Sequence, residues 1–173
     1  VQPRVDKSPA KPGKVILDVE NLCIHAKTHK KDAVHNVSFQ VREGEIVCIA
    51  GIDGNGQTEL VYGLTGLEKS AGGQVTLCEK DISHASIHQR GENMSHIPED
   101  RHKHGLILDF TLEQNMVLQR FREPEFQHAG FIKKGAVRAY AERLIEQYDV
   151  RSGQGPLTIA RSVSGGNQQK AII

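Results

Sequence analysis

The sequence predicts an α/β fold in which a β-rich core precedes a helical part. Apolar residues within residues 15–22 and 33–41 predict two strands. The apolar run 46–50 predicts a third strand, which leads into a glycine-rich turn and a helix-like segment. From Gly105 onward the sequence becomes helical in character. We therefore expect a linker at residues 1–14, a β-rich core at 15–104 and a helical subdomain at 105–173.

Length and composition indicate one domain without a preference for nucleic acid. A chain of 173 residues can bury a hydrophobic core, and its 22 basic and 21 acidic residues nearly cancel. No apolar run has membrane-spanning length, and no signal peptide is visible. We interpret Cys23, Cys48 and Cys78 as reduced thiols of a cytosolic protein, because they are odd in number and lack the C-x-x-C spacing of zinc sites.

The β-rich part contains further predicted elements. Residues 1–14 hold three prolines and no apolar periodicity, which predicts a tether from a preceding domain or, alternatively, a cloning remnant. The first three strands are expected to form one sheet whose third strand delivers the glycine-rich turn. A strand at 74–78, a short helix within 81–91 and a brief buried strand at 94–97 follow. The polar loop after this last strand is Pro98-Glu99-Asp100-Arg101, at a strand end where ligands of such sheets bind.

Two helices are predicted in the second half of the chain. Thr111 is a suitable N-cap for a helix that begins there. In residues 134–148 the apolar side chains fall on one helical face, which indicates packing against the protein or, alternatively, a partner helix. The residues of this face are Val137, Ala141, Leu144, Ile145 and Tyr148.

Residues 51–58, which we call the glycine loop, resemble a phosphate-binding pattern. Gly51, Gly56 and Thr58 match G-x-x-x-x-G-K-[S/T], but Gln57 stands where the lysine belongs. Backbone N–H groups of such a loop and of the next helix can face an anion. The missing lysine would contribute about 1.5–3 kcal/mol through a charged hydrogen bond. We therefore expect weakened nucleotide binding, the alternative being an ordinary strand-to-helix turn.

A second helix start follows Ser164, Gly165 and Gly166, which we call the Ser-Gly-Gly turn. Its free N–H groups, capped by the serine hydroxyl, would make a second anion site; a common turn is the alternative. Among the nine histidines, His96, His102 and His104 are closest together, but no third ligand of a metal site is evident beside His102 and His104. Solvated loop histidines are the plainer interpretation.

Taken together, the glycine loop, the Pro98-Glu99-Asp100-Arg101 loop, the helical region and the sequence Ser164-Gly165-Gly166-Asn167-Gln168-Gln169 resemble an ATP-binding cassette domain, in order and spacing. The resemblance covers residues 15–173. It is strongest to the second cassette of tandem-cassette ATPases that import simple sugars and nucleosides. It implies a P-loop NTPase fold with a mixed β core, an antiparallel β subdomain and a helical subdomain, with the C-terminal part missing.

The resemblance also implies site residues and cofactors, namely ATP and Mg²⁺. Thr58 and Glu99 would contact Mg²⁺, and Glu99 would also sense the γ-phosphate. The Ser-Gly-Gly turn and Gln168 would contact a nucleotide held by the opposite cassette. The residues that would hold the nucleotide of this cassette are Gly51, Asp53, Gly54, Asn55, Gly56, Gln57, Thr58 and Glu59.

The sequence departs from the family pattern at several places. Gln57 replaces lysine, Glu99 replaces glutamine, and Val163 replaces the leucine before the turn. Near Thr28 no aromatic ring is present to stack on adenine, and His25 or His29 would substitute poorly. The chain stops before the acidic strand and the switch histidine. We therefore expect a degenerate loop site, and no ATPase activity from these 173 residues alone.

The partners that the resemblance implies are a preceding first cassette in the same polypeptide, transmembrane permease subunits and, indirectly, an extracellular solute-binding protein. The implied location is the cytoplasmic face of the cell membrane, without nucleic acid. Two alternatives stay open from the sequence. In the first alternative the chain is a cassette ATPase of the repair or translation type. In the second it is a scaffold that has lost nucleotide binding.

Overall fold

The computed structural model describes residues 9–25 and 32–173 and divides the chain into two compact units between Ser95 and His96. Each unit has hydrophobic clusters of its own. In the described ranges, no helix combines the length and the apolar character needed to cross a membrane.

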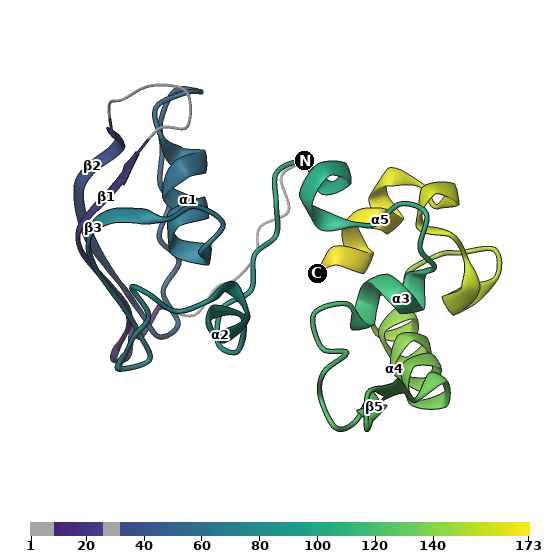
Figure 1. The fold of residues 1–173 in the computed structure, drawn as a ribbon. Coiled ribbons are helices and arrows are strands. Elements are labelled where there is room, and N and C mark those ends of the chain that lie inside the picture. The colour runs from purple at the N-terminus through teal and green to yellow at the C-terminus, as the bar shows by residue number, and fades with distance from the viewer. Residues whose placement is uncertain (1–8, 26–31) are drawn as a thin grey trace. The chain divides into compact units, whose positions relative to one another are not determined.

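The first unit is built on a four-stranded antiparallel sheet with the order β2-β1-β3-β4 (Figure 1). The strands are β1 (Val15–His25), β2 (Asp32–Arg42), β3 (Ser70–Leu77) and β4 (Lys80–Asp81). The strands predicted at 15–22, 33–41 and 74–78 are thereby confirmed. Their apolar side chains gather on one face of the sheet, as a half-buried antiparallel sheet requires.

Helix α1 (Gln57–Thr65) covers that face (Figure 1). Leu60 and Leu64 of α1 are buried in one cluster with Leu22 and Ile24 of β1. Gly63 lies so close to Ile24 that a Cβ atom there would collide with the isoleucine side chain. This packing fixes the start of α1, and with it the glycine loop, against the sheet.

Two predicted strands are absent from the structure. Residues 46–50 form no strand, and Ile46 is 86% exposed. Residues 94–97 form no strand either, and Ile97 is 56% exposed. A strand needs a neighbour for its N–H and C=O groups, and no strand within residues 9–25 and 32–173 pairs with either run. The prediction that a third strand of the sheet delivers the glycine loop is therefore wrong for the described chain.

A buried arginine closes the far end of α1. Arg90 of α2 (Ile87–Gly91) is only 5% exposed. Its guanidinium donates hydrogen bonds to the carbonyl oxygens of Leu64 at 2.8 Å and Gly63 at 3.3 Å, in the last turn of α1. It also donates to the carbonyl oxygens of Ser83 at 2.9 Å and Ala85 at 3.1 Å. Burial lowers the pKa of Arg90 from its ordinary value.

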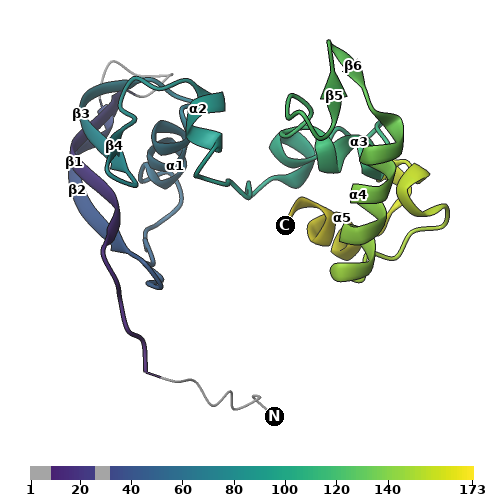
Figure 2. The same ribbon diagram turned by 90° about the horizontal axis from the view of Figure 1, so that it is seen from below.

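The second unit is mostly helical (Figure 2). Its longer elements are α3 (Leu112–Val117), α4 (Lys134–Gln147) and α5 (Gly165–Ile172). Its short elements are η1 (Arg101–Gly105), β5 (Gln127–His128), β6 (Phe131–Ile132), η2 (Gly155–Leu157) and η3 (Ala160–Ser162). Thr111 caps α3 through a reciprocal capping box with Gln114, which confirms the predicted cap.

Two clusters form the interior of the second unit. One contains Leu112 of α3 together with Val150, Ala160 and Val163. The other surrounds the fully buried Phe126 and includes Val137 of α4. Val137 and Ala141 are buried on the predicted apolar face of α4, so that face packs inside the unit.

We expect Arg90→Met to destabilise the first unit by about 2–4 kcal/mol, because it leaves four partly buried carbonyl groups without their charged donor. Urea unfolding measures the loss, and hydrogen exchange of the α1 amides locates it. Arg122→Met, at an exposed position, is the matched control and should cost less than about 1 kcal/mol. Equal losses in the two variants would contradict this account of Arg90.

Candidate functional site

The glycine loop makes a tight turn into α1. Gly54 and Gly56 have φ values of 84° and 91°, in the left-handed region. A Cβ atom on Gly56 would also collide with the backbone carbonyl of Ala33 in β2, so only glycine fits there. No side chain caps α1, whose first internal hydrogen bond runs from Leu60 N to Gly56 O at 2.8 Å. The N–H groups of its first turn therefore face the loop without partners from the helix.

The side chain of Gln57 folds back across this loop. Its Nε2 donates a hydrogen bond to the carbonyl oxygen of Ile52 at 3.2 Å. The same amide lies against Gly51, where a Cβ atom would collide with it. At the position where a lysine would bring a positive charge, the loop is thus closed by a neutral hydrogen bond. Thr58 is exposed at the start of α1.

The charges near the glycine loop do not favour a polyphosphate. Asp53 lies in the loop and Glu59 in the first turn of α1, whereas residues 43–68 contain no Lys, Arg or His. Glu59 interacts favourably with the positive end of the helix dipole. An incoming phosphate would compete with that interaction, so the dipole attracts it less than it would in an uncharged loop.

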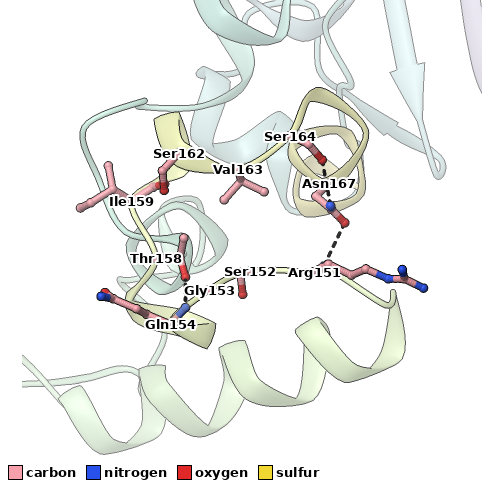
Figure 3. A pocket seen from close by; sticks show the side chains of 10 residues that line it. All are labelled: Arg151, Ser152, Gly153, Gln154, Thr158, Ile159, Ser162, Val163, Ser164 and Asn167. Atoms are coloured by element: carbon pink, nitrogen blue, oxygen red, sulfur yellow. Dashed lines mark hydrogen bonds between the residues drawn. The ribbon is translucent and has the colours of Figure 1, made fainter.

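The Ser-Gly-Gly turn is at the surface of the second unit. Ser164 is the exposed N-cap residue of α5, but its hydroxyl caps no N–H group, and this part of the prediction is wrong. Instead, Ser164 Oγ accepts a hydrogen bond from Asn167 Nδ2 at 2.9 Å (Figure 3). Asn167 Oδ1 in turn accepts from Arg151 N at 2.9 Å. Within residues 9–25 and 32–173, no side chain caps the N–H groups of the first turn, and the bond from Asn167 leaves the hydroxyl hydrogen of Ser164 unused.

A hollow of about 600 Å³ opens beside this turn (Figure 3). Its wall combines the polar side chains of Ser164, Asn167, Arg151, Ser152 and Ser162 with the apolar side chains of Ile159 and Val163. Val163, just before the turn, is 7% exposed and packs into the cluster of Leu112. The valine that replaces the expected leucine thus still anchors the turn to the interior.

Gln168 lies beneath the turn and not on its surface. It is 4% exposed, its Nε2 donates to Ala160 O at 2.9 Å, and its Oε1 is 2.9 Å from His102 Nε2. Both polar atoms of its side chain are thus bonded within the second unit, and the predicted contact with a nucleotide of the opposite cassette stays a prediction. Asn167 is the residue that the sequence prediction missed. The available signal was an amide three residues after the N-cap, from where it can reach back to the capping side chain.

The Pro98-Glu99-Asp100-Arg101 loop leads into η1. Asp100 accepts backbone hydrogen bonds from Lys103 at 3.1 Å and His102 at 2.9 Å, which hold the pKa of its carboxyl below the ordinary value. Glu99 is exposed. It belongs to the second unit and Thr58 to the first, so a Mg²⁺ site that joins them stays a prediction.

Other sequence predictions concern metals, cysteines and the adenine contact. Within residues 9–25 and 32–173 the structure contains no group of three or more His, Cys, Asp or Glu side chains that could hold a metal ion. All three cysteines are free thiols. Thr28 and His29 lie outside the described residues, as do the first eight residues of the predicted linker.

Together, the glycine loop before α1 and the Ser-Gly-Gly turn before α5 define a P-loop nucleotide-binding cassette. The family model described as "ABC transporter" matches residues 34–173, and the chain belongs to this family. The chain is 43% identical over 169 residues to a nucleoside import ATP-binding protein of Lactococcus lactis subsp. cremoris, covering 97% of this chain and 33% of the relative. It is 42% identical over 171 residues to a guanosine import ATP-binding protein of Bacillus subtilis, covering 98% and 33%. The chain spans about a third of the length of these relatives.

Solved structures agree with the fold. The dimeric structure of MJ0796, a bacterial ABC transporter cassette, matches with a TM-score of 0.68 at 20% identity, covering 91% of this chain and 67% of that one. A nucleotide-free ATP-binding cassette from an ABC transporter matches with a TM-score of 0.67 at 18% identity, covering 91% and 64%. The predicted cassette fold is confirmed, and so is the predicted family.

We expect Asp100→Ala to expose the amides of His102 and Lys103 to hydrogen exchange at pH 7. A carboxyl whose folded pKa is lowered stabilises the turn above its unfolded pKa of about 3.9 and loses this effect as the pH falls through the folded value. The difference between native and variant protein should therefore shrink below about pH 4. Asp100→Asn, which retains an acceptor oxygen, is the control. If the exchange rates of native protein and Asp100→Ala still differ as much below about pH 4 as at pH 7, the ionised Asp100 carboxyl does not hold these amides.

Proposed function

We propose that this chain is a nucleotide-binding cassette of an ABC importer for nucleosides or simple sugars, and that it is the second cassette of its polypeptide. Membership of the family and the names of the similar proteins, a nucleoside and a guanosine import ATP-binding protein, support the importer class. In this proposal ATP hydrolysis drives import, and nucleosides are the preferred substrate class. Mg²⁺ accompanies ATP, bound through the Thr58 hydroxyl and Glu99.

The proposal includes an asymmetry between two composite sites. In a head-to-tail pair of cassettes, each nucleotide lies between one glycine loop and the partner's Ser-Gly-Gly turn. The observation that supports this asymmetry most directly is the hydrogen bonding at the N-termini of α1 and α5. Gln57 closes its own loop with a neutral hydrogen bond, while Ser164 is exposed with its hydroxyl hydrogen unused by Asn167. This cassette would then serve a competent site on its partner, and its own site would bind nucleotide without hydrolysing it.

The partners in this proposal are a first cassette preceding residue 1 in the same polypeptide and the membrane-spanning permease subunits. A solute-binding protein would act through the permease. The cassette would lie at the cytoplasmic face of the membrane, where ATP is available. The exposure of Ser164 and the presence of Arg151 and Asn167 in the wall of the adjoining hollow support a nucleotide-bearing partner at that surface.

We expect Gln57→Lys to tighten Mg-ATP binding to the glycine loop of the full protein by about ten- to a hundredfold, because it restores a charged donor to the phosphates. Titration calorimetry measures this change, with the first cassette's site blocked by mutation. Gln57→Met, which has similar length and no charge, should not tighten binding. Equal affinities for the lysine and methionine variants would refute the idea that the missing charge weakens this loop.

In the intact transporter we expect Ser164→Ala to lower ATPase activity about ten- to a hundredfold, because it removes a hydrogen bond to a charged acceptor. Thr58→Ala should change the activity by less than about twofold, since the proposed loop site does not hydrolyse. Steady-state phosphate release from the reconstituted transporter measures both. The reverse ranking would refute the asymmetry, and unchanged activity in both variants would argue against an ATPase role for this cassette.

A further inference from the structure

A chain of two hydrogen bonds connects η1 to α5 beneath the Ser-Gly-Gly turn. Gln168 Nε2 donates to Ala160 O at 2.9 Å, which fixes the orientation of the amide. The Gln168 oxygen must then face His102 Nε2, 2.9 Å away. Because an amide oxygen only accepts hydrogen bonds, His102 Nε2 must carry a hydrogen. This assignment follows from the pattern of partners.

The residue before His102 also meets α5. The guanidinium of Arg101 lies against Gly165, where a Cβ atom would be 2.8 Å from Arg101 Nη2. Arg101 Nε is buried and has no hydrogen-bond partner within the described part of the chain. Burial of an unpaired N–H group costs free energy, which other interactions of the fold offset. Arg101 and His102, which are neighbours in η1, therefore contact Gly165 and Gln168, which lie about one turn apart in α5.

A third contact joins η1 to α5. A Cβ atom on Gly105, at the end of η1, would lie 2.9 Å from Ile172 Cδ1, near the end of α5. The turn η1 thus runs along α5 from Gly165 to Ile172. Helices in proteins gain most of their stability from tertiary packing, so the direction of α5 at its first turns depends on such contacts.

We propose that His102 is a positioning residue for the Ser-Gly-Gly turn: through Gln168 it holds the first turn of α5 so that Ser164 and its neighbouring N–H groups keep one direction. This inference rests on the proposed function, in which that turn meets the phosphate of a nucleotide on a partner cassette. His102 touches no nucleotide itself. A misplacement of about 1 Å in groups that contact the reacting phosphate can lower the rate about a hundredfold. Loss of the buried His102–Gln168 hydrogen bond should therefore have a measurable effect on turnover.

The variant that tests this is His102→Phe in the full transporter, which retains an aromatic ring and removes the donor. We expect kcat for ATP hydrolysis to fall about tenfold while KM changes less than about twofold, because the His102–Gln168 hydrogen bond orients the turn without contacting the nucleotide. His102→Gln, which restores a side-chain N–H donor, should recover most of the loss. His128→Phe, at an exposed histidine of β5, is the matched control and should leave kcat unchanged.

A spectroscopic measurement locates the hydrogen of the His102 imidazole directly. The ¹⁵N shifts of the His102 imidazole in the native protein should identify a protonated Nε2, and Gln168→Leu should shift that signal. A neutral His102 protonated only on Nδ1 would overturn the proposal, even if His102→Phe fails to fold. A fall in both kcat and KM that His102→Gln does not rescue would also overturn it.

The outcomes separate this inference from the proposed function. If Ser164→Ala lowers ATPase activity and His102→Phe does not, the positioning role is refuted and the proposed function stands. If Ser164→Ala leaves activity unchanged, the proposed function itself fails, whatever His102 does. A tenfold fall with His102→Phe, rescued by His102→Gln, supports the positioning role.

Discussion

The constraint on which both candidate sites depend is the set of N–H groups that the first turn of any helix leaves without an internal partner. In most helices a side chain at the N-cap takes one of them. Neither α1 nor α5 has such a cap. At α5 the reason is Asn167, whose amide donates to Ser164 Oγ and accepts from Arg151 N. The Ser164 hydroxyl oxygen is thus bonded to a side chain of α5 and to none of its backbone N–H groups.

The features that sequence could predict are those decided by neighbours along the chain. The apolar pattern of residues 15–22 and 33–41 identified β1 and β2, because burial on one face of a sheet depends on local alternation. Thr111 and Gln114 form a capping box within four residues, so its chemistry is local too. The two helix starts after glycine-rich turns were predictable for the same reason, and they carry the resemblance to the family.

The features that sequence could not predict depend on partners far along the chain. Residues 46–50 have the apolar composition of a buried strand, yet a strand exists only where another strand satisfies its backbone, and none of the described residues does so. The burial of Arg90 has no local signal, because carbonyl groups to which it donates lie up to 27 residues away. Gln168 was predicted to contact a nucleotide of the opposite cassette, and its burial against His102, 66 residues earlier, had no local signal.

The two helix starts differ in backbone geometry, because Gly56 has a left-handed conformation and Ser164 does not, and they also differ in charge. A helix N-terminus carries about half a positive charge whatever its sequence, so the difference in charge comes from side chains. The glycine loop adds the carboxyl groups of Asp53 and Glu59, while the Ser-Gly-Gly turn has the guanidinium of Arg101 against Gly165 and no acidic residue from 150 to 173. A phosphate therefore meets repulsion at one helix start and attraction at the other. Restoring a single lysine at position 57 would offset only part of this difference, because both acidic side chains would still be present beside the loop.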